Sequence, residues 1–450
     1  MSQLDAPMPL DASDRAAPNL KDAPVPSSFW GYVKSWGPGI VVVLSWLGAG
    51  DLVDASVAGA NYGYTLMWAL ALSLIVRFGL VNLIAKFQLL NQKGITLLAG
   101  YQKIHKAMPM VVAIGTVILF HFYNSYMVSG AGNALAHISG VGNTLIWSVV
   151  AVAAAWVLTY RALYGPVEKA MIVILVVMVV SLVGAAIYMR PDVGAAAGGL
   201  FAFSVPAQTG PFAAIMIVVS LIGAVGGSLA NLLYPYFMAE KGWTKPKHRK
   251  VQIYDLAFGV FVLIVIDLAI WVLGAEVLKP RGIVVEGVDD MARMLSELMG
   301  NIGAVIFYLG VLGATFSSTL GYALGGPLIL KDAIRLTWPD RVKRYADPNR
   351  DPIVQVAYYF IFVAALVWAV PGMPGFVWLT VVVNAAQVVL LPLVSLGLLL
   401  IMNRTDLMGV RKNSIWENAF LVLLTALALW GAWQVLMGMG AMLSKLSMGS

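Results

Sequence analysis

Two aspartates lie inside an apolar stretch that is otherwise typical of a membrane-spanning helix. Asp51 and Asp54 follow Gly48 and Gly50 in the segment GIVVVLSWLGAGDLVDASVAGANYGYTLMWAL. A carboxylate at mid-membrane depth costs about 2.5–3.5 kcal/mol on insertion scales, and residues three apart on a continuous helix share a face and repel. The glycines weaken the helix at this point. A cation held between the two carboxylates is the simplest reason for such a pair, so the segment predicts a metal-ion site inside the membrane.

The composition agrees with a membrane setting. The chain has 450 residues, of which 60% are hydrophobic and 11% are charged, whereas soluble domains carry about 25% charged residues. The net charge of +7 lies in short connections between apolar spans, which indicates membrane orientation rather than nucleic-acid binding. The absence of cysteine excludes disulfides, thiolate metal sites and iron–sulfur clusters. No catalytic triad or phosphate-binding glycine loop is found, so neither an enzyme nor a resident cofactor is expected.

Apolar runs of spanning length predict an all-α polytopic membrane protein with about eleven transmembrane helices, by the rule of ~20 residues per span. The polar, proline-rich residues 1–28 are expected to form a disordered cytoplasmic tail, and 29–450 a single transporter domain. The expected spans are 38–58, 62–85, 109–134, 143–163, 167–189, 211–240, 254–278, 302–331, 353–371, 375–402 and 417–440.

Basic residues follow every second apolar run. The other set of connections carries few, among them Arg190, Lys279 and Arg281. By the positive-inside rule the N-terminus is cytoplasmic, and eleven spans place the C-terminus outside. The compact chain without a targeting peptide favours a bacterial plasma membrane. The expected partners are the lipid bilayer and a divalent metal ion, with no nucleic acid, and the expected oligomeric state is a monomer.

The sixth span resembles the first in being interrupted by glycine. It contains Gly223, Gly226 and Gly227, five helices after the first span and running in the opposite direction. Paired interrupted spans indicate an inverted-repeat transporter, in which broken helices expose carbonyls at the bilayer midplane. The repeats would cover about 38–189 and 211–402, with an extra helix at about 417–440. Alternatively, the glycines only allow close helix packing.

After residue 35 the chain resembles the NRAMP family of divalent-metal transporters, whose fold is the LeuT-like 5+5 inverted repeat with broken first and sixth helices. The resemblance is carried by GAGDLVDASVAGANYGYTLMWAL in the first span, VEKAMIVILVVMVV in the fifth, LGVLGATFSSTLGYALGGPLILKDAIRL in the eighth and VVVNAAQVVLLPLVSLGLLLIMNRTDLMG in the tenth. The eighth span has Phe316 where the family has glutamine.

The departures from the family concern its metal ligands. Asp51 matches the metal-binding aspartate, while Asp54 stands where the family has asparagine. The methionine of the family's Met-Pro-His motif falls on Gly227 or Ser228, so the sixth helix supplies no sulfur. Asn384 aligns with a glutamine that approaches the ion. The resemblance therefore implies that Asp51, Asp54 and Asn384 hold the metal with the carbonyls of Ala224 and Gly227.

Groups linked to proton movement in the family are also replaced. Asn124 and Met127 stand at the acidic pair of the third helix, and Leu229 or Ala230 stands at the sixth-helix histidine. Carboxylates, carbonyls and water suit magnesium and manganese better than a thioether does, and Mg²⁺ usually keeps several waters. A wide, doubly acidic pocket without sulfur thus resembles the NRAMP-related magnesium transporter branch, which is described as lacking proton coupling.

The sequence therefore predicts an importer of divalent cations, Mg²⁺ by preference and Mn²⁺ as well, working by alternating access without protons. One alternative is a proton-coupled Mn²⁺ or Fe²⁺ importer, in which Asp267 or His121 replaces the lost titratable groups. The other is a metal sensor or receptor on the same scaffold, against which the short stretch after the last helix argues. His121 is more simply a packed histidine, whereas Asp267 lies deep in the seventh span.

Overall fold

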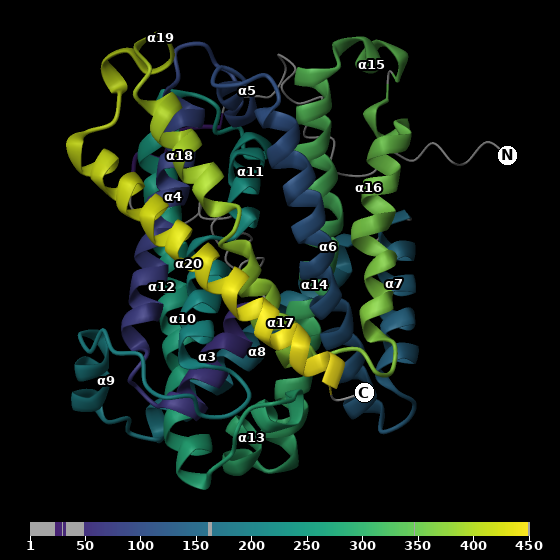
Figure 1. Ribbon diagram of the computed structural model, residues 1–450. Helices are drawn as coiled ribbons and strands as arrows, with labels where there is room; N and C mark the ends of the chain where they lie inside the picture. The colour runs from purple at the N-terminus through teal and green to yellow at the C-terminus, as the bar shows by residue number, and fades with distance from the viewer. Residues whose placement is uncertain (1–22, 29, 33–48, 161–163, 346, 449–450) are drawn as a thin grey trace, which may run out of the picture.

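The computed structural model is entirely helical in the part of the chain that it describes, residues 23–28, 30–32, 49–160, 164–345 and 347–448 (Figure 1). Most of the predicted N-terminal tail, residues 1–22, lies outside this part. The first half of the chain contains α3 (Ala49–Tyr62), α4 (Met67–Leu90), α5 (Leu97–Gln102), α6 (Met108–Ser139), α7 (Thr144–Tyr160), α8 (Tyr164–Tyr188), α9 (Val193–Leu200), α10 (Ala214–Leu221) and α11 (Tyr234–Glu240). The second half contains α12 (Arg249–Leu273), α13 (Val288–Met299), α14 (Asn301–Thr337), α15 (Pro339–Arg344), α16 (Pro352–Phe362), α17 (Phe376–Gln387), α18 (Leu391–Met402), α19 (Thr405–Met408) and α20 (Ile415–Met448).

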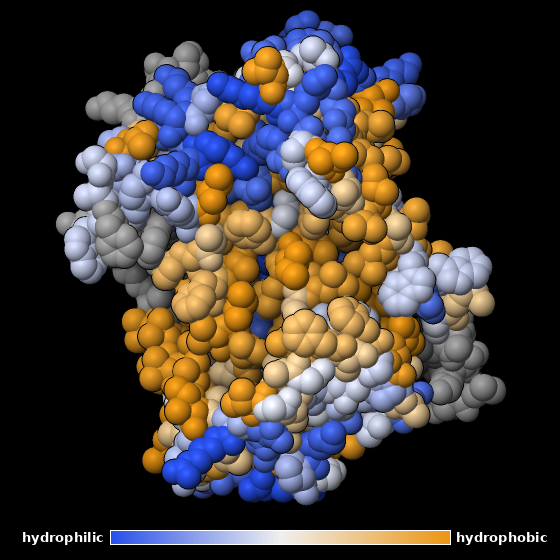
Figure 2. Space-filling view, turned by 90° about the vertical axis from the view of Figure 1, so that its left-hand side faces the viewer, coloured by the Kyte–Doolittle hydropathy of each residue, from blue (hydrophilic) through white to orange (hydrophobic). Residues whose placement is uncertain are grey.

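A broad apolar band separates two hydrophilic ends of the molecule (Figure 2). Among the described residues, eight helical segments are long and apolar enough to cross a membrane, or nine if the sharply bent pair α8 and α9 is one span. The all-helical membrane architecture is therefore confirmed, whereas the predicted count of eleven spans is not.

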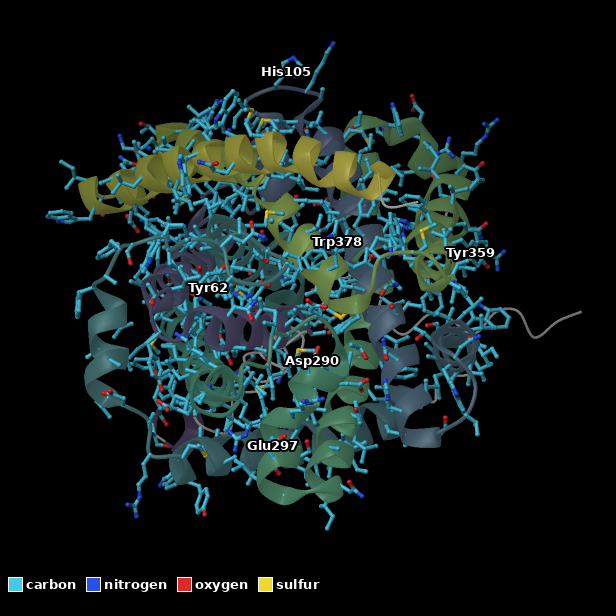
Figure 3. The ribbon with its side chains drawn as sticks, turned by 60° about the horizontal axis from the view of Figure 1, so that its bottom comes forward. Tyr62, His105, Asp290, Glu297, Tyr359 and Trp378 are labelled. Carbon is cyan, nitrogen blue, oxygen red and sulfur yellow. The ribbon has the colours of Figure 1, made fainter. Side chains whose placement is uncertain are left out.

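Three of the connections that carry basic residues lie at one end. The short helices α5, α15 and α19 lie at the top of Figure 1, and α9 and α13 lie at the bottom. Figure 3 likewise places His105 at one end and the acidic residues Asp290 and Glu297 of α13 away from it. The alternation predicted from charge agrees with this arrangement, and the cytoplasmic assignment of the basic end stays a prediction from the positive-inside rule.

The sixth predicted span is broken at its glycines, as expected. Helix α10 passes at Ile222 into one turn of π-helix (Ile222–Gly226), and a short 3-10 helix (Leu229–Leu233) follows before α11. Close packing requires the first glycine, because a Cβ at Gly223 would lie 1.9 Å from the backbone oxygen of Asn384 on α17. The π-turn changes the hydrogen-bond register, which leaves carbonyls available at the interruption.

The tenth predicted span, 375–402, is also interrupted, which was not expected. Helix α17 ends at Gln387 and α18 begins at Leu391. Pro392 stands in the first turn of α18, where its ring is incompatible with a helix that continues from Val388. The break in the first span is untested, because residues 33–48 lie outside the described part and α3 begins at Ala49. The two-repeat division also stays a prediction.

Candidate metal site

The two aspartates of the first span lie in the first two turns of α3 and are buried, Asp51 at 3% and Asp54 at 0% exposure. Asp51 forms an ion pair with Arg77 of α4, in which Nη1 and Oδ2 are 3.3 Å apart. Arg77 is itself only 1% exposed. Both charges of this pair are thus removed from water. A buried arginine without a partner would be costly.

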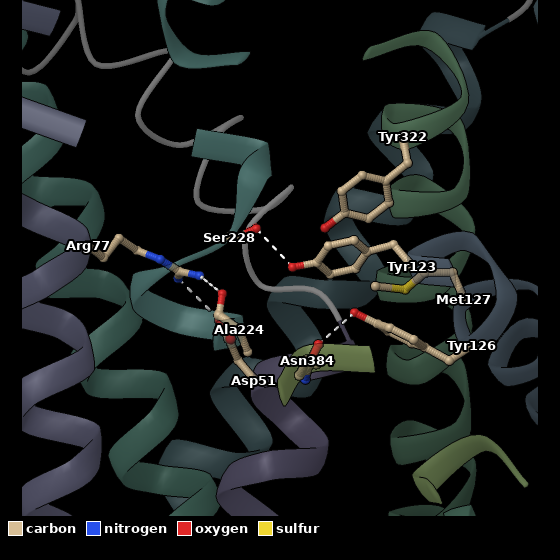
Figure 4. A pocket seen from close by; sticks show the side chains of 10 residues that line it. Asp51, Arg77, Tyr123, Tyr126, Met127, Ala224, Ser228, Tyr322 and Asn384 are labelled. Carbon is tan, nitrogen blue, oxygen red and sulfur yellow. Dashed lines mark hydrogen bonds and ion pairs between the residues drawn. The ribbon is translucent and has the colours of Figure 1, made fainter. Parts of the chain in front are cut away.

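The guanidinium of Arg77 also binds the break in the sixth span. Its Nη2 donates to the carbonyl oxygen of Ala224 at 2.7 Å (Figure 4). Its Nε donates to the carbonyl oxygen of Val225. The next carbonyl, that of Gly226, accepts from Nδ2 of Asn231 at 3.2 Å. Side chains from α4 and from the 3-10 helix therefore satisfy the backbone oxygens that the π-turn leaves available.

Asp54 is held by uncharged donors. Ser220 Oγ lies 2.8 Å from each carboxylate oxygen, and Asn384 Nδ2 donates to Oδ2 at 3.0 Å. The amide oxygen of Asn384 in turn accepts from the hydroxyl of Tyr126 at 3.1 Å. Asn384 thus connects the second carboxylate of α3 to the third span.

A small cavity of about 10 Å³ lies between these groups, which is room for about one water molecule. Its wall is formed by Gly50, Asp51, Arg77, Tyr123, Tyr126, Met127, Ala224, Ser228, Tyr322 and Asn384. The prediction of a wide pocket is wrong for this conformation, because the arginine side chain takes up the space that the missing methionine was expected to leave.

Three of the five predicted ligands, Asp51, Ala224 and Asn384, line this cavity. Asp54 does not line it, but its carboxylate accepts a hydrogen bond from Asn384, which does. Gly227 is not part of the wall either. Ser228 takes its place, with its hydroxyl 3.0 Å from that of Tyr123. The structure brings the first, sixth and tenth spans together as predicted and shifts the sixth-helix contribution by one residue, while ligation itself is untested.

The expectation of a site without sulfur is also wrong. Met127 of α6 is fully buried and lines the cavity, so a thioether is present although the sixth span provides none (Figure 4). Asn124, one turn earlier, donates instead to the carbonyl of Ile361 at 2.9 Å. The residue at the family's second acidic position therefore faces the cavity as a soft, uncharged group.

Asp267 adds a third carboxylate to this region. It lies on α12, which packs against both α3 and α4, and it interacts electrostatically with Asp51, Asp54 and Arg77. Neither of its oxygens has a hydrogen-bond partner among the described residues. Within the same part of the chain, however, no set of three or more acidic or histidine side chains is arranged to hold a metal ion.

His121 is a packed histidine, as the simpler interpretation had it. Its Nδ1 lies 2.7 Å from the carbonyl oxygen of Phe360, Trp368 donates to its Nε2 at 3.2 Å, and the ring stacks on Phe360. Because both ring nitrogens are engaged, the side chain is fixed in place rather than positioned for proton transfer.

The sequence interpretation missed Arg77. The signal was present, since Arg77 is a lone basic residue in the middle of the second apolar span, and a charge at this depth almost always has a partner. Two buried aspartates in the preceding span were the obvious candidates. The contact with the sixth span could not be predicted from the sequence pattern, because it joins residues 147 positions apart.

The comparisons with known proteins agree with this architecture. A sequence model of the family described as "Nramp: Natural resistance-associated macrophage protein-like" matches residues 39–437. The divalent metal cation transporter MntH of Bacillus subtilis (strain 168) is 23% identical over 329 residues, 70% of this chain and 75% of that protein. MntH of Listeria monocytogenes serotype 4b (strain F2365) is 23% identical over 318 residues, 68% of this chain and 70% of the relative.

Solved structures show the same fold. The manganese transporter of Eremococcus coleocola superposes with a TM-score of 0.72 at 17% identity, over 93% of this chain and 90% of that one. The inward-facing conformation of Mhp1 gives 0.52 at 12% identity, over 90% and 91% of the two chains. These similarities support the predicted LeuT-like fold. Since the family match covers most of the sequence, the chain belongs to the Nramp family of integral membrane proteins.

Proposed function

We propose that this protein imports divalent metal cations by alternating access, through the site at the break in the sixth span. The observation that carries the proposal is that the carboxylate of Asp51 and the carbonyl of Ala224 already bind a cationic group together. Hard divalent cations take the same oxygen ligands. The relatives in Bacillus and Listeria are named divalent metal cation transporters, which supports the same class of substrate.

Mg²⁺ is the preferred substrate in this proposal, and Mn²⁺ is also transported. The sixth span contributes oxygen, from Ser228 and from backbone carbonyls, where the family has a methionine sulfur. Oxygen ligands favour Mg²⁺ and Mn²⁺ over softer metals. The thioether of Met127 at the cavity wall is a softer neighbour than oxygen, so the site is not selective for Mg²⁺ alone. This supports Mn²⁺ as the second substrate.

Uptake proceeds without proton coupling in this proposal. The two third-helix positions hold Asn124 and Met127, which do not titrate, and His121 is engaged on both ring nitrogens. An inside-negative membrane potential favours cation entry by about 2.3 kcal/mol per charge per 100 mV, and a divalent ion carries two charges. The proton-coupled alternative would use Asp267, a buried carboxyl group without a hydrogen-bond partner among the described residues.

Flux into proteoliposomes tests these statements. Mg²⁺ should compete with Mn²⁺ uptake, and the vesicle lumen should not acidify when an inside-negative potential drives entry. Asp51→Asn should abolish uptake, whereas Asp340→Asn, at a carboxylate that is 90% exposed, should leave it unchanged. Acidification in step with Mn²⁺ entry would establish the proton-coupled alternative. Undiminished uptake by Asp51→Asn would remove the proposed site.

A further inference from the structure

Arg77 occupies oxygens that a transported cation would need. Its guanidinium binds the Asp51 carboxylate and the carbonyls of Ala224 and Val225, and two of these three groups are proposed metal ligands. A divalent ion and a guanidinium cannot share the same oxygens without strong repulsion. Cation binding at this site therefore requires Arg77 to move to another partner.

Asp267 has the properties of that second partner. It is fully buried, and neither carboxylate oxygen has a hydrogen-bond donor among the residues that the structure describes. It lies within electrostatic reach of Arg77, on a helix that packs against α4. A buried carboxylate without a donor is unfavourable, so the arginine would gain a strong, charge-assisted contact by reaching it.

The charge of the cluster points in the same direction. Three buried carboxylates, Asp51, Asp54 and Asp267, interact electrostatically with one another, and Arg77 is the guanidinium that interacts with Asp51 and Asp267. When all of them are ionised the formal balance is −2, which a divalent cation neutralises. The cluster is thus complete when it holds both the ion and the arginine, provided that each has its own carboxylate.

We infer that Arg77 alternates between two acidic partners: it binds Asp51 and the sixth-span carbonyls before the cation arrives, and it passes to Asp267 when the cation takes those oxygens. The inference rests on the proposed function and adds a mechanism to it. Arg77 acts as a tethered competitor that lowers cation affinity. It returns when the ion leaves, so that neither the Asp51 carboxylate nor the sixth-span carbonyls are left without a positively charged partner.

Three variants in proteoliposomes test the exchange through the Mn²⁺ concentration dependence of uptake. Arg77→Gln removes the competitor and should lower the apparent KM about tenfold while reducing the maximal rate, because release of the ion loses its driving force. Asp267→Asn removes the receiving partner and should raise KM about tenfold. In the double variant Asp267→Asn should have little effect, because no arginine remains to be received.

Two further variants keep the test decisive. Arg77→Lys is informative even if Arg77→Gln does not fold. It retains the charge but cannot bind a carboxylate and two carbonyls at once. The affinity for Mn²⁺ should therefore rise, while uptake should still depend on Asp267. Asp340→Asn serves as the exposed control. A thermal unfolding midpoint for each purified variant identifies those that are folded.

The outcomes separate this inference from the proposed function. Absence of both Mn²⁺ and Mg²⁺ uptake by the unmodified protein overturns the proposed function and the exchange with it. If the unmodified protein takes up the ions and Asp267→Asn does so with the same KM, only the exchange is overturned, because Asp267 would then not be the partner that receives Arg77. Equal effects of Asp267→Asn with and without Arg77 also overturn it, because the two side chains would then act independently.

Discussion

Changing both members of the Asp51–Arg77 pair should be less damaging than the sum of the two single changes. The charged atoms lie 3.3 Å apart and are almost inaccessible to water. At an effective dielectric constant of about 20, two unit charges at this distance attract by about 5 kcal/mol. Asp51→Asn leaves the buried guanidinium without its paired carboxylate, and loss of one member of a buried pair typically costs about 3–5 kcal/mol.

The double variant Asp51→Asn/Arg77→Gln removes both charges and keeps a polar side chain at each position. We expect the two single changes to be non-additive by about 2–4 kcal/mol, a coupling expected for a close, desolvated charge pair. An unfolding entropy of about 2.1 cal/mol/K per residue implies that 1 kcal/mol moves the midpoint by about 1 °C in a chain of this length. The double variant should therefore unfold several degrees above the sum of the single effects.

Tryptophan fluorescence during heating of the purified protein in detergent measures these midpoints. The pair Asp340–Lys343 provides the matched control, since its atoms are 2.7 Å apart but 90% and 78% exposed. Coupling there should stay below about 1 kcal/mol because water screens the charges. Additive single effects at Asp51 and Arg77 would refute the description of these residues as one buried, interdependent pair.

Three other predictions concern separate parts of the molecule. Gly223→Ala forces a Cβ to 1.9 Å from a backbone oxygen of α17 and should abolish Mn²⁺ uptake, whereas Gly321→Ala, with no atom within 4 Å of the new Cβ, should not change it. Met127→Leu keeps the volume but removes the cavity thioether, so Cd²⁺ affinity measured by calorimetry should fall about fivefold or more while Mg²⁺ affinity changes less. Arg404 lowers the pKa of Asp406 to about 2 from 3.8, so the pairing stabilises the fold above about pH 3.8 and is lost as the pH falls towards 2; the midpoint difference between the unmodified protein and Asp406→Asn should disappear over that interval.

The membrane class, the acidic pair and the broken sixth span could be predicted because each depends on local pattern. Asp51 and Asp54 are charged residues in an apolar run. Gly223 and Gly226 lie within an apolar span, where such glycines indicate an interrupted helix. The break at Pro392 was equally local and was overlooked, because the apolar run continues across it. Hydrophobicity alone does not detect a broken helix.

The contents of the site could not be predicted in the same way. The sequence interpretation removed a methionine from the sixth span and inferred open space, but space in a packed interior depends on every neighbour. Arg77 enters from α4 and Met127 from α6, at sequence distances for which periodicity carries no information. The result is a narrow cavity with a sulfur in its wall, where the expected pocket was wide and lined only by oxygen.

The break in the sixth span explains why the place that we propose for a metal ion is held by an arginine in this structure. A π-turn followed by a short 3-10 helix leaves consecutive carbonyl oxygens pointing away from their own helix, and such groups must find a donor or a cation when they are buried. In this protein the guanidinium satisfies two of them and Asp51 together. If the proposed exchange holds, specificity at the break depends on which positive group is held more favourably, and on the alternative partner of Arg77 as much as on the ligands of the ion.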